Sequence, residues 1–559
     1  MLFTALSSLV LAALLAGPAG AASRPPATAK QAPGLETIIQ DDGLLLFRPP
    51  AEVQAAVARM KALGVDRVRV TANWSSLTRA PDSPTKPDGF NAADPAAYEQ
   101  SRWQALDTAV RAVRGAGLQA VIDIGFWAPH WAASDPPGPR ARTNIDPQAF
   151  ADFATALALR YSGGFEPTPD PPSTPPPPPS QDQDIVQAFL QPLIPFPLPD
   201  LIPPATGARA AQASDAAAAA TRGLPSVDEF IVYNEPNHQG LLLPQWKPDG
   251  TPASPAVYRA MVRAAYAAVK SVRHKVKVLI GNTSSTGGVR GVGPVPPLEF
   301  LRELACVDAK LRPRTTGDCA GFTTLPGDGW SHHPYSQNER PTRVSKPRKE
   351  PGDVRLADLP VLAKTLDRLV KMGRLAPANR NIYLTEFGYE TGGIPGRPRV
   401  SQNMQARWLT WAEYLADRVP TVRSFAQFLL RDQPPAPVRV SSSDKRPFGE
   451  YSTGLLLAGG GDKEAAKTFV AGLFAQLQPR HRVLLYGRLR LQPGLKTVLL
   501  QRRLPRDSWR LVEQLRIDGR AAFTRTIAHR SGALYRLTYT DQAGHRTSGM
   551  AIKPVPASG

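Results

Sequence analysis

The stretch VDEFIVYNEPNHQG, Val227 to Gly240, begins as an apolar, β-branched run and ends on an amide, a carboxylate and a proline. β-Branched and aromatic residues are typical of strands, and proline cannot continue a strand that is paired on both sides. Residues 255–273 then repeat apolar residues at helical spacing. The stretch therefore predicts a buried strand followed by a helix, with Asn234 and Glu235 at the C-terminal end of the strand.

The same strand-then-helix unit recurs through residues 35–478. Strand-like runs cover 35–40, 65–74, 118–131, 227–235, 276–285, 329–336, 381–390 and 422–432. Helical patterns follow them at 51–64, 101–117, 147–163, 255–273, 297–305, 356–373, 403–418 and 463–477. This alternation predicts an α/β fold with a parallel sheet, and eight such units close a (β/α)₈ TIM barrel. An open doubly wound sheet is the alternative, and the lack of a glycine-rich turn after any strand argues against it.

Residues 479–559 have a different rhythm. Six short strand-like runs at even spacing are separated by glycine, proline and aspartate. This pattern predicts a small C-terminal antiparallel β-sandwich domain. Residues 165–222, rich in proline and alanine, interrupt the barrel between its third helix and its fourth strand. Helix-to-strand loops lie on the bottom face of such a barrel, so we expect this insertion to lie away from the catalytic face.

The N-terminus predicts export. Residues 1–21 form an apolar run that ends in the small-residue pattern AGA, as in a signal peptide, and residues 22–34 form a linker before the barrel. The apolar run is short for a membrane span, which needs about 20 residues. We therefore expect a secreted, extracellular protein with no membrane span after signal removal. An uncleaved membrane anchor is the alternative.

Cys306 and Cys319 are the two cysteines of the chain. In an exported protein we expect them to form one disulfide that closes a short loop, and two free buried thiols are the alternative. Two thiols are too few for a cysteine-rich metal site. We also expect no other metal site and no cofactor.

The formal net charge of +20 is concentrated near the C-terminus. Residues 480–559 hold 16 Lys and Arg against 4 Asp and Glu. Such a surface favours anionic polymers, and an anionic cell-surface polymer is the partner we expect for this domain. No helix-turn-helix, zinc-finger or RNA-binding motif accompanies the charge, so no specific nucleic-acid binding is predicted. The alternative is the ordinary solvated surface of an arginine-rich protein.

Two glutamates stand at equivalent points of two strands. Glu235 ends the fourth strand, and Glu386, in LTEFG, ends the seventh. The C-terminal strand ends of a (β/α)₈ barrel face the catalytic mouth, so the two side chains can converge from opposite sides. Two carboxyl groups about 5 Å apart suit retaining glycoside hydrolysis, with one as acid/base and the other as nucleophile. That chemistry requires a raised pKa for the acid.

The motifs YNEPN and LTEFG resemble the two signatures of clan A glycoside hydrolases, closest to the cellulase-like family 5 and to family 39. The resemblance covers residues 35–478. It implies a carbohydrate substrate, with Glu235 as the acid/base and Glu386 as the nucleophile. It also implies that Asn234 hydrogen-bonds the 2-hydroxyl of the sugar.

Two further motifs extend the resemblance. HHPYS matches the clan's His-x-Tyr, in which Tyr335 would hold the nucleophile and His333 would line the site. Arg69, in VRVTANW, matches the strand-two arginine that lies close to the nucleophile. A cation and a hydrogen-bond donor both favour an ionised carboxylate, which agrees with these roles. Arg67 shares the face of Arg69 and is its rival.

Aromatic residues cluster at the predicted loops above the strands. Such rings can stack on the apolar faces of sugars, and those expected to bind substrate are Trp74, Trp127, Trp131 and Trp246. Core packing is the alternative for each of them. At the end of strand eight, where many clan members have a tryptophan, this chain offers Gln427 or Phe428. This departure leaves the identity of the sugar open.

The function predicted from these residues is secreted, retaining hydrolysis of β-linked glycosides or polysaccharide. Two alternatives stay open. One is a catalytically silent glycan-binding or cell-surface adhesion protein, which the basic C-terminal domain would suit. The other is a transglycosylase, in which a sugar hydroxyl replaces water in the second step.

Overall fold

The structure is a computed structural model that describes residues 34–136, 140–170, 223–392, 399–434, 451–540 and 544–557. The predicted signal peptide, residues 22–33 of the predicted linker and residues 171–222 of the predicted insertion lie outside the described residues. No helix in the described part of the chain is long and apolar enough to cross a membrane.

The predicted barrel is confirmed. Eight parallel strands close in chain order, and β1 completes the ring by pairing with β8. The apolar runs of the sequence are continuous because the inward face and the helix-covered face of these strands are both buried. The strands are β1 (Glu36–Gln40), β2 (Arg67–Ala72), β3 (Gln119–Ile124), β4 (Glu229–Val232), β5 (Lys277–Thr283), β6 (Gly329–His332), β7 (Ile382–Leu384) and β8 (Val422–Phe428).

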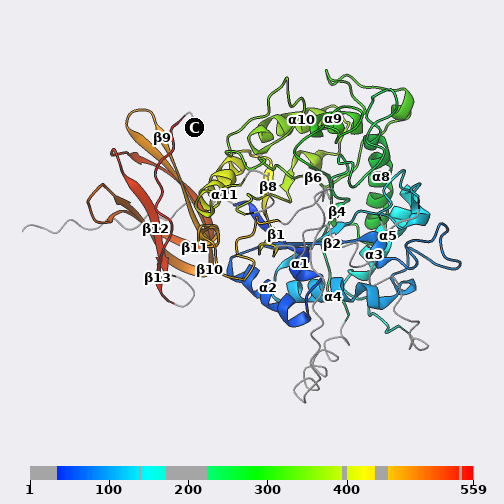
Figure 1. Cartoon of the computed structure of the whole chain (residues 1–559), viewed down its shortest axis with the longest axis horizontal. Coiled ribbons are helices and arrows are strands. Elements are labelled where there is room, and N and C mark those ends of the chain that lie inside the picture. Colours follow the sequence, from blue (N-terminus) through cyan, green and yellow to red (C-terminus); the bar gives the residue numbers. More distant parts are fainter. Residues whose placement is uncertain are drawn as a thin grey trace, which may run out of the picture.

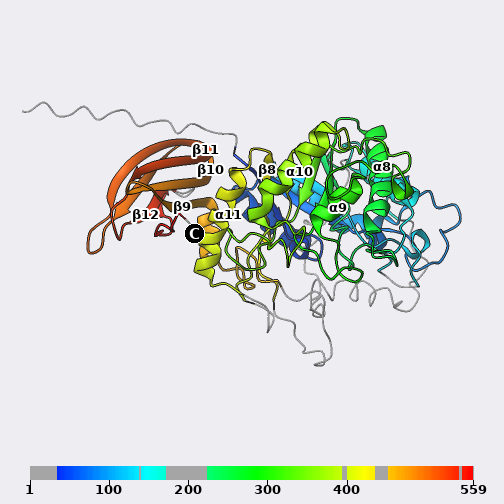
Figure 2. The same cartoon turned by 90° about the horizontal axis from the view of Figure 1, so that it is seen from above.

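Helices return the chain from the end of each strand to the start of the next, as Figures 1 and 2 show. Several of them begin at clear signals: Pro147 opens α5 behind the capping side chain of Asp146, and the hydroxyl of Ser401 caps α11. Two short helices also lie in loops, α1 (Asp42–Leu45) and α3 (Trp74–Leu77). The main helices are α2 (Pro50–Ala62), α4 (Gln100–Gly115), α5 (Pro147–Arg160), α8 (Ser254–Val272), α9 (Pro297–Leu304), α10 (Leu359–Lys371), α11 (Gln402–Asp417) and α12 (Glu464–Val470).

The last predicted helix is wrong in its second half. Helix α12 ends at Val470, and the next residues form strand β9 (Ala471–Gln478), which pairs antiparallel with the C-terminal sheet. Residues 471–475 are all small or apolar, so their period does not distinguish a helix from a buried strand. Pairing with the neighbouring strand decides the outcome, so residues 471–478 belong to the C-terminal sheet.

The C-terminal domain is a single curled antiparallel sheet of five strands, which fits the predicted β-sandwich in class. Two strands are long, because four of the predicted short runs merge into two: β10 (Arg482–Arg503) and β11 (Arg510–Ala528). Strands β12 (Leu534–Thr540) and β13 (Arg546–Ser548) extend it. The sheet bends over its own apolar core and forms a lobe beside the barrel (Figure 1).

Helix α11 lies between the barrel and this sheet (Figure 2). Its Glu413 is buried and accepts hydrogen bonds from two sheet arginines, Arg488 at 3.0 Å and Arg490 at 2.5 Å. The same arginines reach the barrel, where Arg490 donates to the Thr37 hydroxyl and Arg488 to the Leu35 carbonyl. Part of the basic charge predicted to meet a polymer therefore docks the sheet onto the barrel.

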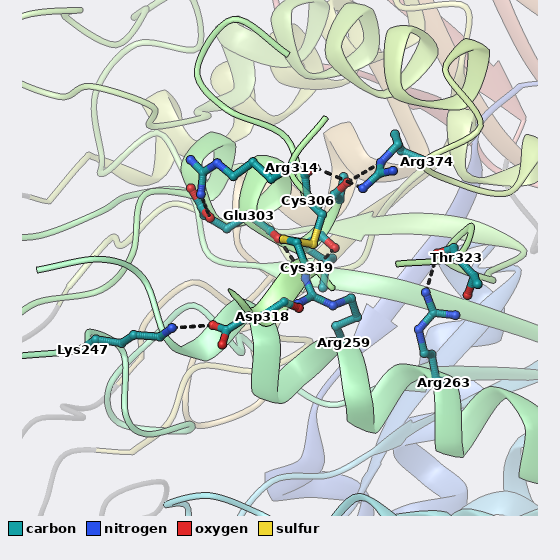
Figure 3. The surroundings of a disulfide bond; sticks show 12 residues. Lys247, Arg259, Arg263, Glu303, Cys306, Arg314, Asp318, Cys319, Thr323 and Arg374 are labelled. Carbon is teal, nitrogen blue, oxygen red and sulfur yellow. Dashed lines mark hydrogen bonds and ion pairs between the residues drawn. A yellow bond between two sulfur atoms is a disulfide. The ribbon is translucent and has the colours of Figure 1, made fainter. Parts of the chain in front are cut away.

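The predicted disulfide is confirmed: Cys306 and Cys319 are bonded. It closes the loop that follows α9 (Figure 3). Arginine side chains fasten this loop by donating to backbone carbonyls, Arg374 to Cys306 and Arg259 to Asp318. The loop is thus anchored to α8 and to the segment after α10.

Candidate active site

The barrel brings Glu235 and Glu386 together at the rim that the C-terminal ends of its strands form. Glu235 follows β4 and Glu386 follows β7, and one carboxylate oxygen of each lies within 4.8 Å of the other. Both side chains keep some exposure, 19% for Glu235 and 11% for Glu386. Tyr233 and Glu235 have positive φ angles, which are unusual for residues other than glycine and are found where a function constrains the chain.

Arg69 is the cation of the site. It lies on β2 with no exposed surface and donates from Nη1 to Glu386 Oε1 at 2.5 Å. Its Nη2 donates to Asp123 Oδ2 at 2.6 Å and to Asn234 Oδ1 at 2.8 Å. Burial alone would lower the pKa of Arg69, but the charges of Asp123 and Glu386 raise it, so the guanidinium stays charged. The rival Arg67 pairs instead with Glu36 and Glu229, away from the two catalytic candidates.

Tyr335 supplies a second hydrogen bond to the proposed nucleophile. Its hydroxyl donates to Glu386 Oε2 at 3.2 Å, and its ring stacks on Phe387. Burial, followed by the charges of Glu386 and Glu235, raises the pKa of Tyr335 well above its ordinary value, so the phenol remains a donor. Glu386 is thereby held at one oxygen by Arg69 and at the other by Tyr335.

His333 lies between the two carboxylates and carries no exposed surface. Its Nδ1 is 2.9 Å from Glu235 Oε1 and 3.6 Å from Glu386 Oε2. Its Nε2 is 2.9 Å from Asn282 Oδ1, an oxygen that can only accept, so Nε2 carries a hydrogen. The hydrogen between Nδ1 and Glu235 therefore belongs to an imidazolium or to the protonated carboxyl group, and the pair shares one proton.

This contact changes the expected electrostatics of Glu235. Burial by itself would raise the pKa of the carboxyl group, but the hydrogen bond and charge of His333 outweigh burial, and the pKa of Glu235 is lowered. The direction is opposite to the raised pKa expected for an acid. The reason is that the transferable proton is held jointly with His333 instead of by an isolated carboxyl group.

Asn282 contacts both His333 and Asn234 and orients them. Gly281 and Asn282 both have positive φ, and the pairing of β5 with β6 shifts its register between Gly281 and Thr283. Such a bulge redirects a side chain. The Asn282 amide donates to the Tyr233 carbonyl at 2.8 Å and to Asn234 Oδ1 at 3.2 Å. These two hydrogen bonds orient the Asn282 side chain so that its oxygen faces His333.

The structure does not support the predicted role of Trp74. Its side chain is fully buried and stacks on Phe153, with Phe150 and Trp131 at its edges. A ring enclosed in this way has no face for a sugar, and Trp74 is a core residue of the β2 side of the barrel. Trp131, in contrast, is half-buried, and Lys86 lies 5.8 Å from the centre of its ring.

Trp127 and Trp246 brace loops at the rim. Trp127 is 2% exposed and donates to the Gly240 carbonyl, while Arg140 lies over its ring. Trp246 is 8% exposed and donates to the Gly293 carbonyl. Both therefore offer less ring surface than expected, and sugar stacking by Trp127, Trp131 and Trp246 stays a prediction.

The residues at the end of β8 also include no tryptophan ring on which a sugar could stack. Gln427 is buried, and its amide donates to the carbonyls of Leu429 and Thr453. The ring of Phe428 packs edge-on against Tyr451. Gln427 thus supports the backbone of the rim.

Three site residues escaped the sequence prediction: Gln40, Asp123 and Asn282. Each is a polar residue at or near the end of an apolar strand, which is the signal that found Glu235 and Glu386. Gln40 accepts from Arg69 Nη1 at 2.5 Å, so all three contact the network around Arg69 directly or through Asn234. Applying the strand-end criterion to β1, β3 and β5 would have found them.

The polar atoms of Glu235, His333 and Glu386 form a compact triangle that could also accommodate a cation. Within this triangle, His333 Nδ1 lies 2.9 Å from Glu235 Oε1 and 3.6 Å from Glu386 Oε2. The expectation that no metal or cofactor takes part stays a prediction.

No protein-family model and no curated protein matches the sequence. Among solved structures, the chain is similar to a monomeric β-xylosidase from Caulobacter crescentus CB15, with 13% identity, a TM-score of 0.44, and 92% of this chain and 97% of that chain covered. It is also similar to an exo-β-1,4-mannosidase from Opitutaceae bacterium strain TAV5, with 15% identity, a TM-score of 0.38, and coverages of 80% and 61%. An endo-β-1,4-mannanase from Thermotoga petrophila gives 11% identity, a TM-score of 0.35, and coverages of 95% and 100%. Similarities this distant assign no activity, so the function has to be inferred from the site.

Proposed function

We propose that this protein is a retaining glycoside hydrolase of the clan A type that acts on β-linked glycosides or polysaccharide. The observation that carries the proposal is the pair of carboxylates from opposite sides of the rim, Glu235 and Glu386, with oxygens within 4.8 Å. Retaining enzymes hold their carboxyl groups about 5 to 5.5 Å apart, whereas inverting enzymes need about 6.5 to 9.5 Å to admit a water molecule.

The surroundings of the two carboxylates suit different roles. Glu386 is oriented at both oxygens by Arg69 and Tyr335, as a nucleophile requires, and has no shared proton to give. Glu235 shares a proton with His333 and can both give and recover it. We therefore assign Glu386 as the nucleophile and Glu235 as the acid/base.

The reaction then has two steps. Glu235 protonates the glycosidic oxygen while a Glu386 oxygen attacks the anomeric carbon, which breaks the bond to the leaving group and forms a glycosyl-enzyme ester. Glu235 next removes a proton from water, the water oxygen attacks the same carbon, and the ester bond to Glu386 breaks. Two inversions restore the β configuration. Asn234, which accepts a hydrogen bond from Arg69 at 2.8 Å, is the residue that we assign to the 2-hydroxyl of the sugar.

The proposal also includes secretion and an anionic polymer as a partner of the C-terminal residues. The apolar N-terminal residues support secretion. The net positive charge of residues 480–559 supports contact with an anionic cell-surface polymer, through those arginines that do not dock the sheet onto the barrel.

The decisive experiment is a panel of aryl β-glycosides and β-linked polysaccharides, tested with the wild type, Glu235→Gln and Glu386→Gln. We expect cleavage of at least one substrate and losses of about 10³-fold or more in both variants. Glu390→Gln is the matched control, because Glu390 also follows β7 but binds Ser452 in a neighbouring loop. Its activity should stay within about threefold of the wild type.

Two measurements separate the alternatives. The configuration of the first-formed product, followed by NMR, should be β, and an α product would exclude the retaining mechanism. Binding of a glycan without turnover would favour the adhesion protein. Transfer of the glycosyl group to an added sugar at the expense of water would favour the transglycosylase.

A further inference from the structure

Asp123 is a third carboxylate of the site that the proposed reaction does not use. It lies on β3 with no exposed surface, and its Oδ2 accepts from Arg69 Nη2 at 2.6 Å. Its Oδ1 is also buried and has no hydrogen-bond partner among the described residues. A buried carboxylate with one unsatisfied oxygen is costly, so its place beneath the two glutamates calls for an explanation.

Arg69 is divided between two carboxylates. Nη1 contacts Glu386, and Nη2 contacts Asp123. A guanidinium prefers to grip a carboxylate with two parallel N–H groups. With Nη2 engaged by Asp123 and by Asn234, Glu386 receives a single bond from Arg69, and its other oxygen is left for Tyr335.

Asp123 also balances charge. The charged groups that act on it are Arg69 on β2, His333 after β6 and Glu386 after β7, and the charge of Asp123 acts in turn on the phenols of Tyr233 and Tyr258. Burial raises the pKa of Asp123 above its ordinary value, although Arg69 and His333 oppose this effect. The ion pair with Arg69 at 2.6 Å favours the ionised form of Asp123. Charges this close and this buried interact strongly, so the ionised Asp123 reduces the net positive field that Arg69 exerts on Glu386.

We propose that Asp123 is a positioning residue for the nucleophile: it holds Arg69 in single-point contact with Glu386 and offsets part of the arginine charge. The inference rests on the proposed function, in which Glu386 attacks the anomeric carbon. A carboxylate gripped at both oxygens by an uncompensated cation is a weaker nucleophile, because its electron pairs are already engaged. Asp123 prevents that arrangement.

The test is Asp123→Asn, which removes the charge and keeps the shape. With the charge gone, Arg69 acts fully on Glu386, so ionisation of the nucleophile becomes easier. We expect the acidic limb of the kcat/KM profile to move to lower pH by about one unit. We also expect kcat at the pH optimum to fall by roughly 10- to 100-fold.

The matched control is Asp107→Asn. Asp107 forms a similar buried ion pair with Arg160, at 2.5 Å, but it joins α4 to α5 outside the site. This variant should lose a comparable amount of stability in urea unfolding while its pH profile overlays that of the wild type. Asp123→Glu, which restores the charge, should return the acidic limb to within about 0.3 unit of the wild-type position.

An acidic limb of Asp123→Asn that coincides with the wild type and with Asp107→Asn would overturn the inference. If Asp123→Asn does not fold, Asp123→Ser replaces it in the same comparison with the same expected shift. A wild type that cleaves no member of the substrate panel defeats the proposed function itself. An active wild type with an unshifted variant defeats only the role of Asp123.

Discussion

Two of the clusters that bury arginine against carboxylate in the described residues lie at the rim of the barrel and at the seam between barrel and sheet. At the seam, Arg490 uses all three nitrogens, toward Thr37, Phe469 and Glu413. At the rim, Arg69 Nε and Asp123 Oδ1 have no hydrogen-bond partner among the described residues. The side chains of Glu235 and Glu386 at the rim are 19% and 11% exposed, whereas the Glu413 side chain is 6% exposed.

The difference separates an ion pair that joins elements from one that does chemistry. Buried charges persist when hydrogen bonds satisfy them, and the seam meets this condition fully. At the rim, hydrogen bonds satisfy the buried charges only in part, and the carboxylate oxygens of Glu235 and Glu386 stay accessible at the open end of the barrel. Unsatisfied and partly exposed polar atoms are the feature that distinguishes the proposed active site from a purely structural cluster.

The largest expected effect comes from removing each central arginine. Arg69→Met and Arg490→Met should each destabilise the fold by about 3–5 kcal/mol, because each leaves a buried carboxylate short of a partner. Arg69→Met should also lower kcat/KM by about 10³-fold, since the nucleophile loses its cation. Arg490→Met should keep kcat/KM within about threefold, measured well below its unfolding midpoint. Equal kinetic losses in the two variants would remove the distinction between the clusters.

The second largest effect is expected from removing the hydroxyl group of Tyr335. Tyr335→Phe should lower kcat/KM by roughly 10- to 100-fold, because a hydrogen bond to a charged group contributes about 1.5–3 kcal/mol. The control is Tyr161→Phe, since the Tyr161 hydroxyl donates to the carboxylate of Asp107 at 2.8 Å outside the site. Steady-state kinetics should show a loss in the first variant alone. A comparable loss in Tyr161→Phe would indicate a general effect on packing.

Acid should weaken the seam through Glu413. Burial tends to raise the pKa of Glu413, but Arg490 and Arg488 outweigh burial and lower it. A carboxyl group with a lowered folded-state pKa contributes stability that is present above its unfolded pKa of about 4.3 and is lost as the pH falls through the folded value. Urea unfolding of the wild type should therefore weaken more steeply below about pH 4.3 than that of Glu413→Gln. Parallel pH dependences would contradict the assignment.

The smallest effect is expected at the exposed edge of the seam. Arg59 and Asp462 form a salt bridge at 2.6 Å with side chains 37% and 45% exposed. Solvent screens such a pair, so Arg59→Ala should cost less than about 1 kcal/mol and the cost should shrink in high salt. Urea unfolding at low and high salt measures this. A loss as large as that of Arg490→Met would mean that burial does not set the strength of these pairs.

Much of the fold follows from sequence periodicity. The alternating runs identified the strands and helices of the barrel, and Glu235 and Glu386 meet where strand-end reasoning put them. The family resemblance, in contrast, pointed to Arg69, His333 and Tyr335, which contact these glutamates. The exception, residues 471–478, begins with five small or apolar residues in a row, which fit a helix or a strand, so pairing with β10 makes it a strand. Trp74 shows the same limit, because a tryptophan after a strand can face the mouth or the core.

The sequence by itself determined which residue types end each strand, because local hydrophobic patterns record burial and strand boundaries directly. The tertiary structure alone decided which of those residues are partners. Arg69 meets Glu386 and Asp123 across the barrel, Asn282 reaches His333 through a bulge, and Arg490 meets Glu413 across a domain seam. Partnership depends on closure of the barrel and docking of the sheet, and no local pattern encodes the distance between residues so far apart in the chain.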